Sequence, residues 1–271
     1  MKKNAKPMSA ASLRFRNFLI AFCFVAAALG LSAYFLFMCR VETVLVKNTV
    51  TVPQPVIMDA ANVKAGRHLF AISRAKIERA IIDSSPYVKS VTLERKLPST
   101  LHICIEDYKT AYYIEHKGEY YLLSDKLFVI EKTTPEDALD LGAAPLMLPE
   151  LKEYKKPEDE NEPFEEVHLR ETLAFKVKTD LAWCEKLLDA IADTDFADMI
   201  TSVDLADPFD LTVIVSEKYT LHLGNEKNFA AKLARCENAI HYLTENMYGV
   251  RGIIHATDNA PVTFEITGVA E

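Results

Sequence analysis

The sequence predicts an α+β protein in which a single membrane-spanning helix precedes two folded domains. The first observation is a twenty-residue run, Leu19–Met38, that contains no charged residue and no histidine. The second is a β-α-α-β-β order of elements over residues 41–107, which is typical of a small two-layer domain. The third is that residues 108–271 mix short strand patterns with two amphipathic helical patterns, which favours a mainly antiparallel β domain with flanking helices.

The apolar run is long enough to cross a membrane, because about 20 helical residues span the roughly 30 Å hydrocarbon core. Five basic and no acidic residues precede it, so the positive-inside rule places residues 1–18 in the cytoplasm and everything after Arg40 outside. A cleaved signal peptide would have a shorter apolar core of about 7–15 residues. Because Tyr34–Met38 continues past the small residues where cleavage would occur, we prefer an uncleaved anchor to a signal peptide or a buried soluble helix.

The charge balance limits the classes of partner. Residues 1–40 carry six basic and no acidic side chains, which leaves 25 basic and 39 acidic residues in 41–271, a formal charge of −14. Nucleic acids and anionic lipid head groups bind clustered Lys and Arg, so we expect no nucleic-acid partner, and lipid contact through the anchor only. The three cysteines outside the anchor region, Cys104, Cys184 and Cys236, form no CxxC motif and are interpreted as buried free thiols.

The first domain is predicted to contain three strands and two helices. Ser73 is a good N-cap for the second helix, and Pro86 requires that helix to end before it. The expected elements are a strand at Val41–Val46, a helix at Val56–Asn62, the helix after Ser73, and strands at Val88–Lys96 and Leu101–Glu106. Both helices can then cover one face of a three-stranded sheet.

Three short motifs in this domain resemble those of a known family. They are V-x-x-G-x-x-L-F at Val63–Phe70, P-Y-V-K-S-V at Pro86–Val91 and R-x-L-P-x-T-L at Arg95–Leu101. In this order, and directly behind a single N-terminal anchor, they resemble the POTRA domain of the FtsQ/DivIB cell-division family. The resemblance implies a POTRA domain at residues 41–107, followed by the β domain of that family at 108–271.

The second domain is expected to begin with a hairpin and to end with a strand. A segment with many charged residues and two prolines, Lys152–Glu166, is predicted to be a solvated loop. The predicted strands are Thr110–Glu115, Tyr120–Ser124, Phe128–Glu131, Ser202–Ala206, Asp210–Val215, Tyr219–Leu223, Gly252–Ala256 and Val262–Ile266. The predicted helices are Asp180–Asp193, with Asp180 as its cap, and Glu226–Asn246.

No motif for catalysis, cofactor binding or metal binding is present in the sequence. There is no nucleophile elbow, no HExxH and no His/Cys spacing suited to zinc, and eight glycines provide no phosphate-binding loop. Acidic pairs such as Asp204 and Asp207 lack an aromatic platform for a sugar substrate. We therefore predict a protein that is not an enzyme, with no catalytic, cofactor-binding or metal-binding residue and no small-molecule substrate.

The last predicted strand is the candidate binding site. An edge strand presents unpaired N–H and C=O groups, and Val262–Ile266 contains no Lys, Arg or Pro to block pairing with another chain. We therefore predict β-augmentation by a partner, with Phe264 supplying specificity. The alternative is a final strand that the preceding helix covers and that needs no partner. The predicted partner-binding residues are Val262, Thr263, Phe264, Glu265 and Ile266, together with Ile254 in the neighbouring strand.

The resemblance implies a function for this edge. FtsQ/DivIB proteins are non-catalytic divisome scaffolds of the plasma membrane, and their β domain holds FtsB/DivIC-like and FtsL-like bitopic proteins at the septum, chiefly through its C-terminal strands. The alternative is an anchored secretion or outer-membrane assembly factor that also carries a POTRA domain. Residues after 110 lack the regular ten-residue amphipathic strands of an outer-membrane barrel, which disfavours that alternative.

Overall fold

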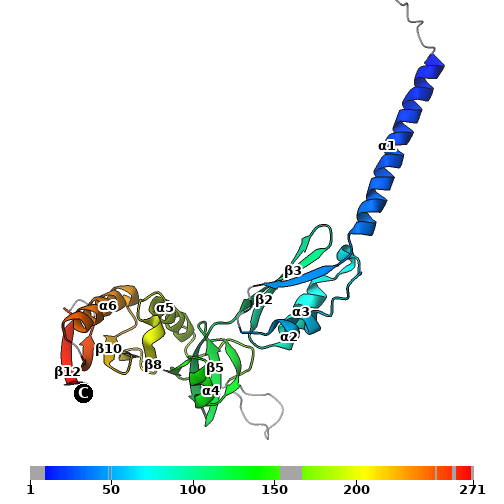
Figure 1. The fold of residues 1–271 in the computed structure, drawn as a ribbon. Coiled ribbons are helices and arrows are strands. Elements are labelled where there is room, and N and C mark those ends of the chain that lie inside the picture. The colour runs from blue at the N-terminus through cyan, green and yellow to red at the C-terminus, as the bar shows by residue number, and fades with distance from the viewer. Residues whose placement is uncertain are drawn as a thin grey trace, which may run out of the picture. The chain divides into compact units, whose positions relative to one another are not determined.

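The computed structural model describes residues 10–47, 49, 51–152, 167–247, 249–257 and 261–269. The chain forms two compact units, Met1–Asp107 and Tyr108–Glu271, each with its own hydrophobic core (Figure 1). The mixed α+β fold class that the sequence predicts is confirmed. The charged loop predicted at Lys152–Glu166 lies outside the described residues from position 153 onward.

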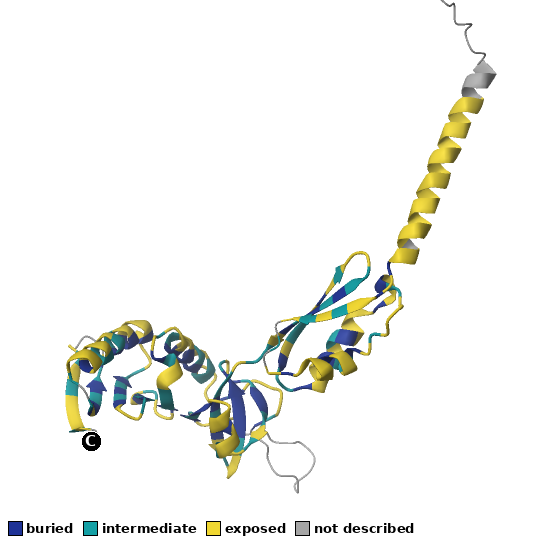
Figure 2. Ribbon diagram, viewed as in Figure 1, coloured by how far each residue is buried: buried dark blue, intermediate teal, exposed yellow. Residues whose placement is uncertain are grey.

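The N-terminal helix α1 spans Ala10–Met38 and contains the predicted anchor. Its segment Phe15–Phe35, 21 residues, is long and apolar enough to cross a membrane. The described side chains of α1 between Phe15 and Met38 are exposed (Figure 2), which suits contact with lipid. The hydroxyl of Ser32 donates to the carbonyl oxygen of Ala28 at 2.8 Å, so this polar group is satisfied within the helix.

The rest of the first unit has the predicted β-α-α-β-β order. Its elements are β1 (Thr43–Lys47), α2 (Gln54–Ala61), the 3₁₀ turn η1 (Leu69–Ala71), α3 (Arg74–Ser84), β2 (Val88–Lys96) and β3 (Thr100–Asp107). The sheet order is β1-β3-β2, with β1 parallel and β2 antiparallel to β3. Leu101, Ile103 and Ile105 on one face of β3 are buried in the same apolar cluster as Ile77 and Ile81 of α3.

The second unit is built on one nine-stranded sheet of order β12-β11-β10-β9-β8-β7-β4-β5-β6. Its strands are β4 (Thr110–His116), β5 (Glu119–Ser124), β6 (Val129–Thr133), β7 (Ala144–Met147), β8 (Ile200–Asp204), β9 (Leu211–Val215), β10 (Tyr219–Gly224), β11 (Val250–His255) and β12 (Thr263–Val269). Its helices are α4 (Pro135–Asp140), α5 (Asp180–Ala192), the 3₁₀ turn η2 (Ala197–Met199) and α6 (Phe229–Asn246).

Local chemistry explains how these strands are connected. Lys117 and Gly118 form a two-residue turn between β4 and β5, and their φ angles of +52° and +82° are the positive values that a type I′ hairpin turn requires. Helix α6 connects β10 to β11. These two strands are parallel, and parallel neighbours have to be joined by a crossover connection of this kind. The apolar faces of α5 and α6 bury Trp183, Leu187 and Leu233 in the same core as the central strands.

The structure differs from the sequence prediction at three elements. Helix α4 was not predicted, because six residues are too few to show a helical period; Thr134 caps it by accepting the N–H of Asp137 at 3.2 Å. The N-cap position of α5 is Thr179, whose side chain makes no capping hydrogen bond, so the prediction of Asp180 as the cap is wrong by one residue. Instead, the carboxylate of Asp180 accepts a hydrogen bond from the indole N–H of Trp183 at 3.2 Å. Strand β12 continues past the predicted end, Ile266, to Val269.

Candidate partner-binding edge

Strand β12 is the last strand of the nine-stranded sheet. It pairs antiparallel with β11, and within the described ranges no strand pairs with its other side. In an antiparallel strand the N–H and C=O groups of alternate residues point to opposite neighbours, so part of the β12 backbone directs its polar groups outward.

The face that β12 shares with the core is apolar along its whole length. On β11, Val250, Gly252 and Ile254 are buried, and the residues opposite them on β12 are Val269, Ile266 and Phe264. Directly opposite residues lie on the same face of a sheet, so these three β12 side chains belong to the core face.

Burial on this face falls off toward the end of the chain. The half-buried Phe264 packs against the core, and its ring meets that of Tyr219 edge-on at 6.4 Å between centroids. Ile266 and Val269 remain 53% and 68% exposed. We call these two residues the edge strip, an apolar surface that continues the core of the protein without cover from its own described residues.

The opposite face of the edge is polar. Thr263 and Glu265 are exposed there, and a carboxylate oxygen of Glu265 lies 3.8 Å from Nε2 of His255 on β11. The ring of His255 stacks on that of His222 at 5.3 Å between centroids, and Nδ1 of His222 lies 3.3 Å from a carboxylate oxygen of Asp210. A chain that adds to β12 therefore meets an apolar face on one side and a charged face on the other.

Three of the predicted contact residues lie in the core or pack against it. Ile254 is 0% exposed because it lies beneath the sheet surface in the main core, so its prediction as a partner contact is wrong. Phe264 and Val262 are half-buried and pack against the core, and their role as partner contacts stays a prediction. Val269 was not among the predicted residues, because the predicted strand ended at Ile266.

Val269 lies on the core face because of an irregularity in the strand pairing. The register between β11 and β12 shifts between Arg251 and Gly252, whose partners are Gly268 and Ile266. Thr267 is the extra residue, so the apolar spacing changes from two residues to three between Ile266 and Val269. The signal in the sequence was an apolar residue three positions after Ile266, which fits a strand only when a bulge is allowed.

Gly252 lets β12 approach β11 closely. A Cβ atom at this position would lie 2.2 Å from the backbone oxygen of Glu265 and 2.7 Å from two ring atoms of Phe264. No side chain fits in this space without displacing β12. The edge strand is therefore held tightly on its inner side while its outer side is open.

The titratable side chains of the described residues form no metal-binding cluster. Within the described part of the chain, no three His, Cys, Asp or Glu side chains come together in a way that could hold a metal ion.

Comparison with known proteins identifies the first unit. The family model of the FtsQ-type POTRA domain matches residues 39–108, which contain the β-α-α-β-β module. Residues 39–108 therefore form a POTRA domain of the FtsQ type, which confirms the resemblance to the FtsQ/DivIB family. The sequence motifs at Val63–Phe70 and Pro86–Leu101 lie within the matched region.

Several curated relatives are similar to the chain over about half of their own length. Cell division protein DivIB of Clostridium botulinum (strain Hall) is 25% identical over 120 residues, which cover 44% of this chain and 46% of that protein. DivIB of Solibacillus silvestris is 23% identical over 197 residues, covering 73% and 59%. Cell division protein FtsQ of Corynebacterium glutamicum is 24% identical over 121 residues, covering 44% and 54%.

Proposed function

We propose that this chain is a non-catalytic scaffold of the cell-division machinery that holds other membrane-anchored division proteins at the septum by strand addition to β12. The FtsQ-type POTRA domain and the names of the relatives support the process. The observation that carries the mechanism is the open edge of β12 with its exposed apolar edge strip. The POTRA-like module is a second docking surface nearer the anchor.

Strand addition would satisfy both properties of this edge. The main chain of an added strand would pair with the outward N–H and C=O groups of β12, which gives affinity with little sequence preference. Apolar side chains of the same partner would cover Ile266 and Val269, which gives specificity. The partner class that fits is a small bitopic protein of the FtsB/DivIC or FtsL type, with an extended segment outside the membrane.

The topology follows from the anchor. With residues 1–18 in the cytoplasm and α1 in the plasma membrane, the POTRA module and the second unit lie outside, where the extracytoplasmic parts of bitopic partners are reachable. The alternative of a secretion or outer-membrane assembly factor has no support from the relatives reported above, which are named for cell division.

The test substitutes the edge strip. We expect the double variant Ile266→Lys, Val269→Lys to lose co-purification of FtsB/DivIC-like and FtsL-like proteins from native membranes by about tenfold or more, because two central apolar contacts are replaced by charges. The thermal midpoint should stay nearly unchanged, since both side chains are already exposed.

A matched control replaces an exposed apolar residue elsewhere. Phe209 is 80% exposed in the connection between β8 and β9, so Phe209→Lys introduces a similar charge away from the edge. The proposal is wrong if the edge-strip variant captures these partners as well as Phe209→Lys does.

A further inference from the structure

The end of α1 is fixed to the POTRA module by backbone hydrogen bonds. The carbonyl of Cys39, one residue after α1 ends, accepts the N–H of Leu69 at 2.8 Å. The N–H of Glu42 donates to the carbonyl of Ser99, in the turn between β2 and β3, at 2.9 Å. Two segments that are distant in the sequence are therefore held beside the point where the chain leaves the membrane.

We call residues 39–43, 64–72 and 94–99 the membrane-proximal rim. Two large apolar side chains of the rim are exposed, Phe70 at 51% and Leu97 at 54%. Both belong to the segments that the backbone bonds hold beside the end of α1. The rim is thus an apolar surface that begins where the membrane-spanning helix ends.

The ring of Phe70 is held in its exposed position by its neighbours. The guanidinium carbon of Arg95 lies 5.6 Å from the centroid of this ring, and Nη2 of Arg95 donates to the carbonyl of Ile72 at 2.8 Å. The N–H of Phe70 donates to Nδ1 of His68 at 3.3 Å. Leu69 is 0% exposed, so the turn η1 buries one side chain and presents the next. A ring that is already positioned loses little conformational entropy on binding.

The rim is positively charged, although residues 41–271 together carry −14. Its basic residues are Arg40, Lys64, Arg67, Arg95 and Lys96, and its acidic residues are Glu42 and Glu94, a formal charge of +3. Nζ of Lys96 lies 3.6 Å from a carboxylate oxygen of Glu94. Arg40, Lys64 and Arg67 are exposed and form no ion pair with another described residue.

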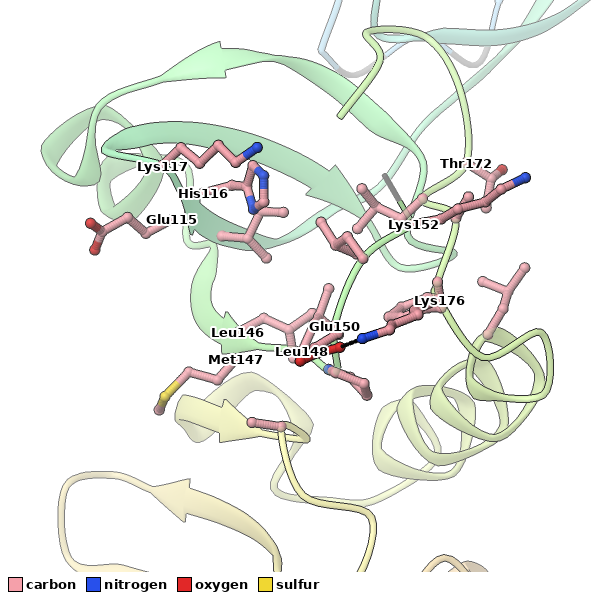
Figure 3. Close-up of a pocket in the computed structure, with 18 of the residues that line it drawn as sticks. Glu115, His116, Lys117, Leu146, Met147, Leu148, Glu150, Lys152, Thr172 and Lys176 are labelled. Atoms are coloured by element: carbon pink, nitrogen blue, oxygen red, sulfur yellow. Dashed lines mark hydrogen bonds and ion pairs between the residues drawn. The ribbon is translucent and has the colours of Figure 1, made fainter. Parts of the chain in front are cut away.

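Several lysines of the second unit, by contrast, are paired with carboxylates. Lys176 forms an ion pair with Glu150 on the wall of a cavity of about 1330 Å³ (Figure 3). Nζ of Lys132 lies 2.8 Å from a carboxylate oxygen of Glu119. The charge of these lysines is balanced within the protein, whereas the exposed cations of the rim remain available to an anion outside it.

Exposed apolar rings beside basic side chains are typical of surfaces that contact a membrane. Phe and Leu side chains enter the boundary between head groups and acyl chains, and Lys and Arg bind anionic head groups. The same combination begins on the anchor itself, because the guanidinium carbon of Arg40 lies 5.1 Å from the ring centroid of Phe37 in the last turn of α1. The rim continues this chemistry onto the POTRA module.

We propose that the membrane-proximal rim lies on the bilayer surface. Phe70 and Leu97 enter the boundary between head groups and acyl chains, and Arg40, Lys64 and Arg67 bind the phosphates of anionic phospholipids. The POTRA module is thereby seated on the membrane and does not pivot about the end of α1. This contact goes beyond the expectation that lipid is contacted through the anchor only, and it does not depend on the function proposed for β12.

The test places a fluorescent reporter on the rim of the full chain in lipid nanodiscs. Lipids with bromine atoms on the acyl chains near the head group quench tryptophan that reaches them. We expect them to reduce the added fluorescence of the Phe70→Trp variant by at least about half, because an interfacial ring lies at that depth. Trp183 is 8% exposed in the second unit and provides a background that the unchanged chain measures.

A matched control lies on the same module. Ile82 is 36% exposed on α3, eight residues beyond the first residue of that helix, which is about 12 Å along its axis. We expect the Ile82→Trp variant to be quenched less than half as strongly as Phe70→Trp. Leu97→Trp is a second reporter of the rim and should be quenched as Phe70→Trp is; circular dichroism checks the folding of each variant.

The charge of the rim is tested in the Phe70→Trp background. Quenching should be stronger in nanodiscs that mix phosphatidylglycerol with phosphatidylcholine than in phosphatidylcholine alone, because the first lipid is anionic. The triple variant Arg40→Gln, Lys64→Gln, Arg67→Gln should lose this difference.

A control triple variant removes the same number of charges from exposed lysines of the second unit. Lys186→Gln, Lys218→Gln, Lys227→Gln should keep the stronger quenching in phosphatidylglycerol, since none of these lysines belongs to the rim. Nanodiscs that contain this chain as the only exported protein exclude a partner protein as the source of the contact.

Three results would overturn the proposal. The first is quenching of both rim reporters that is no stronger than that of Ile82→Trp, which would show that the module is not seated by its rim. The second is quenching that does not depend on phosphatidylglycerol. The third is an equal response of the two triple variants to phosphatidylglycerol, which would show that the cations of the rim do not bind the head groups.

Discussion

Substitution of Gly252 by alanine tests whether β12 is held as tightly as the structure indicates. The added Cβ would lie 2.2 Å from the backbone oxygen of Glu265, whereas ordinary contacts begin near 3.4 Å. The oxygen must therefore recede by about 1 Å, and because it belongs to the backbone the whole strand must move with it. Overpacking of this kind typically costs about 1–3 kcal/mol, and a backbone clash belongs near the upper end.

The free energy that holds β12 in place is of similar size. Half-burial of Phe264 contributes about 1–1.5 kcal/mol, and its edge-on contact with Tyr219 about 0.5–1.5 kcal/mol. The backbone bonds to β11 add about 0.5–1.5 kcal/mol each, but ordering each residue costs about 1–2 kcal/mol. A clash of about 2–3 kcal/mol therefore cancels most of the net free energy that holds β12 on β11. We expect Gly252→Ala to detach β12 locally without unfolding the core.

Hydrogen exchange measured by mass spectrometry can resolve this outcome. Amide protection in 261–269 should fall by about 30- to 150-fold, which corresponds to 2–3 kcal/mol, while peptides from β9 and β10 keep their protection. Gly268→Ala is the matched control on the same strand pair, because its Cβ would meet nothing within 4 Å. If both variants exchange like the unchanged chain, β12 does not approach β11 as described and the reasoning fails.

Three further predictions concern other parts of the chain. Deleting residues 155–163 should leave the thermal midpoint of the protein within a few degrees, because Lys152 remains paired with Ala174 outside the deletion; an insoluble product would contradict this. Cys184 and Cys236 should resist iodoacetamide at pH 8 until urea is added, because burial raises the pKa of both thiols, that of Cys236 to about 12; labelling of the native protein, read by mass, would refute their burial. Burial also raises the pKa of Tyr112 to about 12 from a usual value near 10, so its contribution to stability is complete below pH 10 and is lost as the pH rises toward 12. The free energy of unfolding, measured with urea, should therefore fall less steeply over that pH range in the Tyr112→Phe variant than in the unchanged chain. Parallel pH profiles of the two proteins would show that Tyr112 does not ionise on unfolding.

The individual elements were largely predictable because their signals are local. Alternation along β3 placed Leu101, Ile103 and Ile105 on one face, and all three are buried. Spacings of three and four residues located α6, whose buried side chains include Phe229 and Leu233. Such patterns depend only on neighbours in the sequence, so no knowledge of the fold was needed to read them.

The strand order of the large sheet was not predictable in the same way. Strand β7 has four residues and pairs on both sides with strands that are distant in sequence, at Tyr112↔Ala144 and Leu146↔Val203. A strand of four residues is too short to show a periodic pattern, and a local pattern does not specify which strands it joins. The position of β7 between β4 and β8 could therefore be found only in the structure.

The candidate site was predicted at the level of the strand and not of the side chain. Alternation places Phe264 and Ile266 on one face, yet Phe264 contacts Tyr219 while Ile266 is 53% exposed. The difference depends on where the core ends, which is a property of packing between distant elements. The bulge at Thr267 then places Val269 on the same face, and no local sequence pattern predicts that bulge.

The close approach at Gly252 and the exposure of Ile266 together suggest how the edge would bind. A strand that is already ordered loses little conformational entropy when a partner adds to it, and such pre-organisation raises affinity without new contacts. Gly252 is buried and cannot touch a partner, but Gly252→Ala should still weaken partner capture because β12 would have to be reordered on binding. Ile266→Lys should weaken capture while leaving hydrogen exchange in β12 unchanged, since its side chain is already exposed. Capture that survives Gly252→Ala despite faster exchange would show that the partner does not use β12 as an ordered template.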